Sequence, residues 1–140
     1  MAAKSYSLEF GGYWREPNIG GMPKVSGVYC VYACTYSASE KTVSIRKLVY
    51  IGEAANVNER VAEHEKWEDW RTHLKPGEVL CLSSAPVSST DRERVEAALI
   101  FHYKPPENEE FKDSFPFDST TISTKGRNAL LDTGFTVNQT

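Results

Sequence analysis

The pattern of hydrophobic and polar positions predicts a β-hairpin in the first half of the chain. Residues 26–36 are mostly apolar or aromatic, and residues 42–51 are rich in β-branched side chains, which favour strands. The polar segment 37–41 between them has the composition of a hairpin tip. Because side chains alternate across a strand, Tyr29 lies on the opposite face from Cys30 and need not be a core residue.

A helix is predicted from Val57 to about Trp70, where one face at steps of three and four carries Val57, Arg60, Val61, His64, Trp67 and Arg71. Asn56 is suited to the N-cap position, with Glu59 three residues later completing a capping box. At this spacing Arg60 and His64 lie one turn apart on the same face. The sequence therefore predicts that their side chains can reach one phosphate together.

Further elements follow the turn predicted at Lys75-Pro76-Gly77. Residues 78–83 alternate enough for a third strand, and Thr90 with Glu93 forms a second capping box. The helix that this box opens should run to about Tyr103. Residues that favour a turn or a cap thus separate the predicted strands and helices.

The two ends of the chain carry weaker patterns. Residues 1–25 fit a short edge strand followed by a surface loop. In the C-terminal extension, residues 109–140, the polar stretch 118–128 precedes apolar patches at 129–131 and 135–137, which could add a short strand or cover the sheet. We expect one domain over residues 1–140, of the α/β (α+β) class, with a small central, mostly antiparallel sheet flanked by helices.

Composition narrows the class of protein. A chain of 140 residues with 40% hydrophobic content can bury one core. No apolar run of about 18 residues could cross a bilayer, and the first residues lack the apolar core of a secretory signal, so we expect a cytoplasmic protein with no membrane partner. The three cysteines, Cys30, Cys34 and Cys81, form no CxxC pair and are expected to be buried, reduced thiols.

The charge balance argues against an ordinary nucleic-acid-binding protein. Lys and Arg number 16 and Asp and Glu number 19, which leaves a net charge of -3, whereas dedicated DNA-binding domains are usually basic. No Lys/Arg-rich run is present, and residues 63–69 are locally acidic. Any affinity for DNA must therefore come from a small, concentrated cationic surface.

Six features in a fixed order resemble the GIY-YIG nuclease domain over residues 26–108. They are Gly27-Val28-Tyr29, Tyr50-Ile51-Gly52, Arg60, His64, Glu96 and Asn108. The spacing from Tyr50 to Arg60, and from Glu96 to Asn108, is similar to that in the nuclease domain of the bacterial nucleotide excision repair incision subunit. Each tripeptide alone is a weak signal, but the ordered set is specific.

The chain departs from the family pattern at three points. Val28 stands where the family name has Ile, and residues 30–49 make a longer hairpin than compact members have, with no assigned role. Homing and repair members usually carry an added DNA-binding domain, and no such pattern is visible here. Targeting to DNA is then expected to come from a homo-oligomer or a protein partner.

The chemistry of phosphodiester cleavage suits these residue types. Glu96 is a candidate ligand for Mg²⁺ (or Mn²⁺), which prefers few protein carboxylates and keeps several waters. Arg60, a permanently charged fork, suits the scissile phosphate. His64 could orient a phosphate or transfer a proton near neutral pH.

The resemblance assigns the remaining roles. It implies a metal-dependent endonuclease acting on DNA, with Tyr29 accepting the proton of the attacking water and Tyr50 positioning water or phosphate. A free tyrosine is only about 0.1% phenolate at pH 7, so His64 stays a rival base. Asn108 is expected to tie its loop to the active site through its amide.

Other functions remain open from the sequence. Taken singly, the tyrosines fit half-buried strand positions, and Arg60 and Glu96 fit solvated helix positions. One alternative is a catalytically weak nucleic-acid-binding or protein-interaction module on the same fold. Another is a metal or phosphate hydrolase that is not a nuclease.

Overall fold

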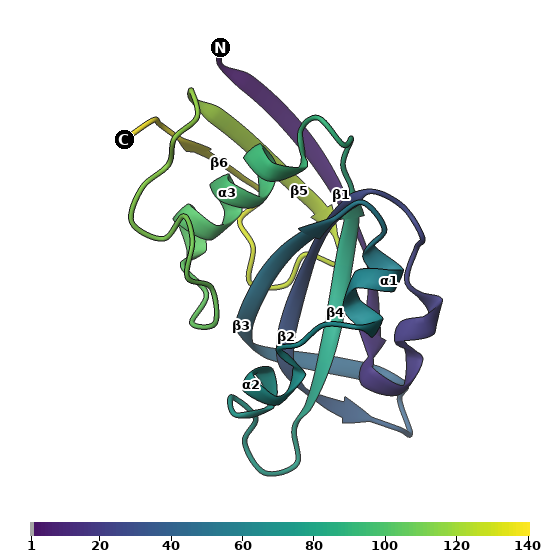
Figure 1. Cartoon of the computed structure of the whole chain (residues 1–140). Coiled ribbons are helices and arrows are strands. Elements are labelled where there is room, and N and C mark those ends of the chain that lie inside the picture. The colour runs from purple at the N-terminus through teal and green to yellow at the C-terminus, as the bar shows by residue number, and fades with distance from the viewer. Residues whose placement is uncertain (1) are drawn as a thin grey trace.

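Six strands form the centre of the protein, in the order β3-β2-β4-β1-β5-β6. The computed structural model describes residues 2–140, and Figure 1 shows their arrangement. The strands are β1 (Lys4–Arg15), β2 (Gly27–Ser37), β3 (Thr42–Ala54), β4 (Val79–Pro86), β5 (Thr120–Gly126) and β6 (Gly134–Val137). The helices are η1 (Glu16–Gly21), α1 (Val57–Ala62), α2 (Trp67–Arg71) and α3 (Arg92–Tyr103). Only β1 and β5 pair in parallel, so the predicted α+β class with a mostly antiparallel sheet is confirmed.

The predicted hairpin is confirmed as β2 and β3, joined by the turn 38–41. Tyr29 lies opposite Gly52, and Val31 lies opposite Tyr50, so the two tripeptide motifs are adjacent in the sheet. The prediction that Tyr29 need not be a core residue is wrong, since its side chain is 1% exposed. The reason is that helices cover both faces of β2, which buries every residue of 27–34.

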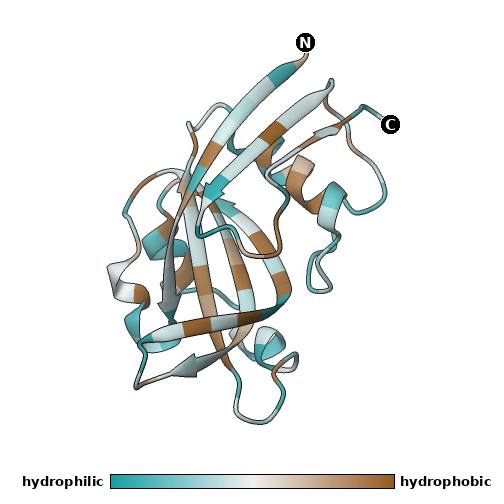
Figure 2. Ribbon diagram, turned by 180° about the vertical axis from the view of Figure 1, so that it is seen from behind, coloured by the Kyte–Doolittle hydropathy of each residue, from teal (hydrophilic) through white to brown (hydrophobic). Residues whose placement is uncertain are grey.

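Two hydrophobic clusters lie on opposite faces of the sheet. One packs α3 against β1, β2, β4 and β5, and the other packs α1, α2 and η1 against β2, β3 and β4. Figure 2 shows the apolar positions concentrated in the strands and on α3. Trp70 is fully buried in the second cluster, where it packs α2 against the sheet.

The prediction of one continuous helix from Val57 to about Trp70 is wrong, because α1 ends at Ala62 and α2 begins at Trp67. In a continuing helix the carbonyl of Val61 would accept the N–H of residue 65. Instead it accepts the His64 N–H at 3.2 Å and the Trp67 indole N–H at 2.9 Å. The break turns His64 into the interior, so the prediction that Arg60 and His64 share one helix face and can reach one phosphate together is wrong.

The N-cap predicted from the sequence is confirmed for α1 and wrong for α3. The side chain of Asn56 accepts the N–H of Glu59, as predicted for α1. The capping box predicted for Thr90 and Glu93 is absent, because α3 begins after Asp91, whose carboxylate instead accepts the Tyr6 hydroxyl.

The ends of the chain form more of the sheet than the sequence predicts. β1 has 12 residues and lies between β4 and β5, so it is not a short edge strand. β5 arises from the polar stretch 118–128, where alternate residues Thr120, Ile122 and Thr124 are buried. β6 is the short strand expected from the final apolar patch. β4 extends beyond the predicted third strand as far as Pro86.

All three cysteines are buried and free, as predicted. No helix within residues 2–140 is both long and apolar enough to cross a membrane.

Candidate functional site

A cleft of about 330 Å³ opens beside the end of β3, between the turn after α1, the helix α3 and the loop that follows α3. Of the residues predicted for the active site, five line this cleft: Tyr29, Tyr50, Arg60, Glu96 and Asn108. They come from two strands, two helices and a loop. His64 does not line the cleft.

The two glycine-containing motifs owe part of their composition to close contacts. A Cβ atom at Gly52 would lie 2.3 Å from the Tyr29 hydroxyl oxygen, so the Tyr29 ring crosses the β3 backbone where only glycine leaves room. A Cβ atom at Gly27 would lie 2.3 Å from the carbonyl oxygen of Ala85 on β4. Gly52 therefore places the Tyr29 hydroxyl at the cleft.

The rings of His64 and Trp70 pack against the ring of Tyr50, which lies next to that of Tyr29. The ring centroids of Tyr29 and Tyr50 lie 6.3 Å apart, and the His64 ring lies 5.4 Å from Tyr50 and 4.5 Å from Trp70. Burial raises the pKa of Tyr50 to about 12 and raises that of Tyr29 well above 10. Both phenols are protonated at neutral pH in the protein without bound ligands.

His64 is a neutral, buried side chain. Burial, with Arg60 next, lowers its pKa to about 4. Its Nδ1 accepts the backbone N–H of Lys66 at 3.1 Å, so in the neutral ring the proton is on Nε2. Nε2 is buried without a hydrogen-bond partner among residues 2–140. With its one lone pair engaged, His64 lacks a free acceptor for the proton of a water molecule.

Arg60 lies at the mouth of the cleft and forms a two-pronged ion pair with Glu65. Its two terminal nitrogens donate to the two carboxylate oxygens at 2.8 and 3.0 Å. The Arg60 side chain is 40% exposed and that of Glu65 is 65% exposed. A phosphate can accept the same pair of hydrogen bonds as a carboxylate, so the Arg60 donors that Glu65 engages are also suited to a phosphate.

Glu96 on α3 is the most perturbed carboxyl group of the cleft. Burial, followed by the negative charges of Glu53, Glu110 and Glu93, raises its pKa to about 8. A divalent cation would relieve both effects, which fits Glu96 as a ligand. Within residues 2–140, no three His, Cys, Asp or Glu residues are grouped so as to hold a metal. Any ion here would keep most of its water ligands, as Mg²⁺ does.

Asn108 joins the loop after α3 to the exposed edge of β3. Its Oδ1 accepts the Ile51 N–H at 2.9 Å, and its Nδ2 donates to the Ile51 carbonyl at 2.8 Å. The N–H of Glu107 donates to the Val49 carbonyl at 3.1 Å. Asn108 thus acts as one residue of an additional strand, which is the tie between loop and site that the sequence predicts. Because both ends of its amide are engaged, it positions the motif containing Tyr50.

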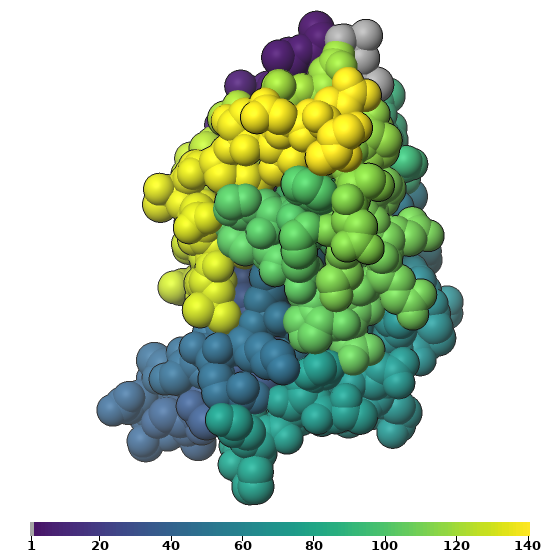
Figure 3. Space-filling view, turned by 90° about the vertical axis from the view of Figure 1, so that its left-hand side faces the viewer, coloured from purple at the N-terminus to yellow at the C-terminus, as the bar shows by residue number. Residues whose placement is uncertain are grey.

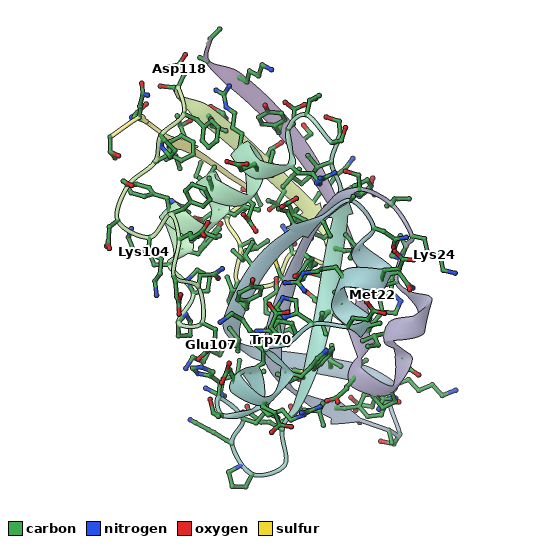
Figure 4. All side chains as sticks on the ribbon, viewed as in Figure 1. Met22, Lys24, Trp70, Lys104, Glu107 and Asp118 are labelled. Carbon is green, nitrogen blue, oxygen red and sulfur yellow. The ribbon has the colours of Figure 1, made fainter. Side chains whose placement is uncertain are left out.

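The cleft also contains charged residues that the sequence analysis did not single out: Glu53, Lys66, Glu107, Glu109 and Glu110. Together with Glu96, five carboxyl groups face two cationic side chains. The run Glu107 to Glu110 around Asn108, and Glu53 directly after Gly52, were the available signals. Figure 4 labels Glu107 on the loop after α3 and Trp70 on α2. The cleft is acidic, so it suits a cation better than an unaccompanied phosphate.

The arrangement combines a carboxyl group suited to a divalent cation, a cationic fork and two phenols on one concave surface. Such a set can bind a metal ion together with a phosphate ester and transfer a proton beside them. No family model, curated protein or solved structure matches the chain.

Proposed function

We propose that the protein is an endonuclease of the GIY-YIG type, which hydrolyses DNA phosphodiester bonds with one divalent metal ion at Glu96. The observation that carries this proposal is the meeting of Tyr29, Tyr50, Arg60 and Glu96 on one cleft, although they come from four different elements. A domain that kept only the shape of the fold would have no physical need for that polar set.

Binding of the scissile phosphate is assigned to Arg60. Its guanidinium exchanges the Glu65 carboxylate for two non-bridging phosphate oxygens, which offer the same fork geometry. Glu65 is largely exposed and returns to water, so the exchange replaces one charge-assisted pair by another. Tyr50, half-buried beside Arg60 in the cleft, donates a hydrogen bond from its hydroxyl to water or phosphate and keeps its proton.

Proton transfer from the attacking water is assigned to Tyr29. Its hydroxyl reaches the cleft, whereas His64 lies outside the cleft and has its lone pair engaged. The pKa of Tyr29 is raised by burial and lowered by Arg60, so added positive charge is needed to form the phenolate. A divalent ion held by Glu96 would supply that charge and neutralise the phosphoryl and leaving oxygens.

The acidic cleft favours one rival. Five carboxyl groups around the site oppose unaided binding of a polyanion, which is the property expected of a catalytically weak module that binds a protein partner. The two proposals differ in a measurable product, because only the nuclease yields new 3′ and 5′ ends.

The test is incubation of the purified protein with supercoiled plasmid, branched DNA and single-stranded DNA, each with Mg²⁺ or Mn²⁺. We expect nicked or linear product from the wild type on at least one substrate, and at least 100-fold less from Glu96→Ala and Tyr29→Phe, as typical for loss of a metal ligand or a base. Cleavage that survives both substitutions would overturn the site. Binding without cleavage on every substrate would favour the module.

A further inference from the structure

A second hollow, of about 390 Å³, lies at the tip of the β2–β3 hairpin, whereas the cleft lies at the other end of β3, and the charge of its lining residues is opposite. It is lined by β1, the tip of the β2–β3 hairpin and the loop after β5, which contribute Arg15, Lys41 and Arg127. No Asp or Glu lines it. In Figure 3 the blue end of the hairpin projects below the yellow-green C-terminal segment, and the surface is recessed between them.

The arginines of this hollow differ from the others in the protein. The other five all have guanidinium partners: Arg46 with Glu78, Arg60 with Glu65, Arg71 with Glu68, Arg92 with Glu53, and Arg94 with Thr120 and backbone carbonyls. Across residues 2–140, Arg15, Lys41 and Arg127 make no ion pair and no side-chain hydrogen bond. Two forked cations and one ammonium group therefore face the same space with their donors free.

The positions of these cations are set by the fold. Arg15 ends β1, and its guanidinium carbon lies 3.7 Å from the centroid of the Tyr36 ring on the hairpin, which holds it by a cation–π contact. Lys41 ends the hairpin turn with φ of 56°, a conformation that glycine or asparagine adopts more readily. Arg127 follows β5, where its backbone N–H donates to the Phe10 carbonyl on β1.

Clustered cations without a counter-charge are unusual in a protein of net charge -3. Like charges repel, so the cluster is stabilised when an anion occupies the hollow. Guanidinium forks donate in pairs to the non-bridging oxygens of a phosphate group, and several cations in one hollow match the repeated charges of a nucleic-acid backbone. The acidic cleft gives no such surface for a nucleic-acid backbone.

We propose that Arg15, Lys41 and Arg127 form a phosphate-binding site that holds the DNA backbone away from the bond to be cut. This inference rests on the proposed nuclease function for the identity of the ligand. It gives the long hairpin a role, because Tyr36 and Lys41 lie at its tip. The site supplies the concentrated cationic surface that an acidic chain needs to hold DNA.

The first test measures DNA binding without cleavage, in EDTA. Fluorescence anisotropy follows a labelled mixed-sequence duplex with wild type, with the double variant Arg15→Gln/Arg127→Gln, and with Lys24→Gln/Lys75→Gln. The control variant also loses two positive charges, but from exposed positions that do not line the hollow. We expect the arginine variant to bind about tenfold or more weakly and to lower the salt slope by roughly one to two, with a smaller loss for the control. Equal losses in both variants would overturn the proposal.

A second measurement checks the site directly and excludes misfolding. NMR spectra of the Arg Nε–Hε groups are recorded while wild type is titrated with the duplex, with inorganic pyrophosphate or with poly-glutamate. We expect the Arg15 and Arg127 signals to shift with duplex DNA. Shifts with pyrophosphate alone, or stronger shifts with poly-glutamate, would overturn the assignment to DNA, as would no shift at all.

The outcome is separable from that of the nuclease proposal. If the wild type cleaves DNA and the Arg15→Gln/Arg127→Gln variant binds DNA as well as the wild type does, the second site alone is refuted. A protein that cuts no substrate but shifts its Arg15 and Arg127 signals with DNA would refute the nuclease alone.

Discussion

Single side chains at the candidate site depend on their neighbours more than on their own chemistry. Tyr29 reaches the cleft because Gly52 leaves space for its ring. His64 looks like a base in the sequence, yet the helix break buries it and engages its Nδ1. The residue types at the site could be predicted from spacing. Their protonation and partners could not, because both depend on burial and on the three-dimensional course of the chain, such as the turn that places Glu65 against Arg60.

Replacing Glu65 by Gln should free Arg60 for phosphate. The substitution removes the competing carboxylate and one negative charge at the mouth of the cleft, so we expect DNA affinity and kcat/KM for cleavage to rise roughly two- to fivefold. Steady-state cleavage rates at low DNA concentration measure the effect. Glu68→Gln is the matched control, because Glu68 pairs with Arg71 on α2 and does not line the cleft. A lower kcat/KM for Glu65→Gln would show that Glu65 instead holds Arg60 in its working position.

Glu96 should make the protein without metal less stable as the pH rises. Its pKa is about 8 in the folded state, and about 4.3 is expected in the unfolded chain. Between these values the folded state holds the extra proton, so stability from this group is complete below about pH 4 and is lost as the pH passes 8. Glu96→Gln removes that loss, and we expect it to be more stable than wild type at pH 9 by roughly 2–4 kcal/mol.

Urea unfolding in EDTA at pH 5 and pH 9 measures this difference. Glu93→Gln serves as a control on the same helix, because its exposed carboxylate should give a much smaller change. A Glu96→Gln variant that is less stable than wild type at pH 9 would contradict the environment described for Glu96.

At the scale of elements, the sequence predicts a strand or helix correctly where the spacing of apolar residues, or a local cap, is enough to specify it. The hairpin, β4, α3 and the Asn56 cap follow from alternation, helical spacing and local capping. The break between α1 and α2 was missed because the Trp67 indole N–H binds the Val61 carbonyl six residues earlier, and the spacing of apolar residues does not reveal that a side chain takes up this helix acceptor. β5 was missed because its buried positions include threonines, which look polar until a neighbouring strand covers them.

The loop after α3 should depend on the Asn108 amide for its attachment to β3. Asn108→Ala leaves the N–H and C=O of Ile51 without their partners at a position where Asn108 is 7% exposed. We expect a loss of about 2–4 kcal/mol in the free energy of unfolding and faster hydrogen exchange of the Ile51 amide. Asn138→Ala is the control, because Asn138 is exposed and should change stability by less than about 0.5 kcal/mol. Unchanged exchange at Ile51 would contradict this role.

At the scale of the whole molecule, charge is divided between two hollows. The cleft with Glu96 is lined by five carboxyl groups, and the hollow with Arg15 is lined by none. Net charge alone, which the sequence gives as -3, conceals this separation. The class of the fold and the convergence of the motif residues could be predicted, whereas the separation of charge depends on how β1 and the C-terminal loop meet the hairpin tip.

The central claim is that the carboxyl group of Glu96 enables metal-dependent hydrolysis of DNA in this cleft. The most direct test compares single-turnover cleavage of a DNA substrate with Mg²⁺ by wild type, Glu96→Gln and Glu93→Gln. We predict that Glu96→Gln lowers the rate at least 100-fold, while Glu93→Gln, which removes a neighbouring charge outside the cleft, stays within about threefold of wild type. A wild-type protein that leaves the DNA intact, or equal rates for wild type and Glu96→Gln, would contradict the account.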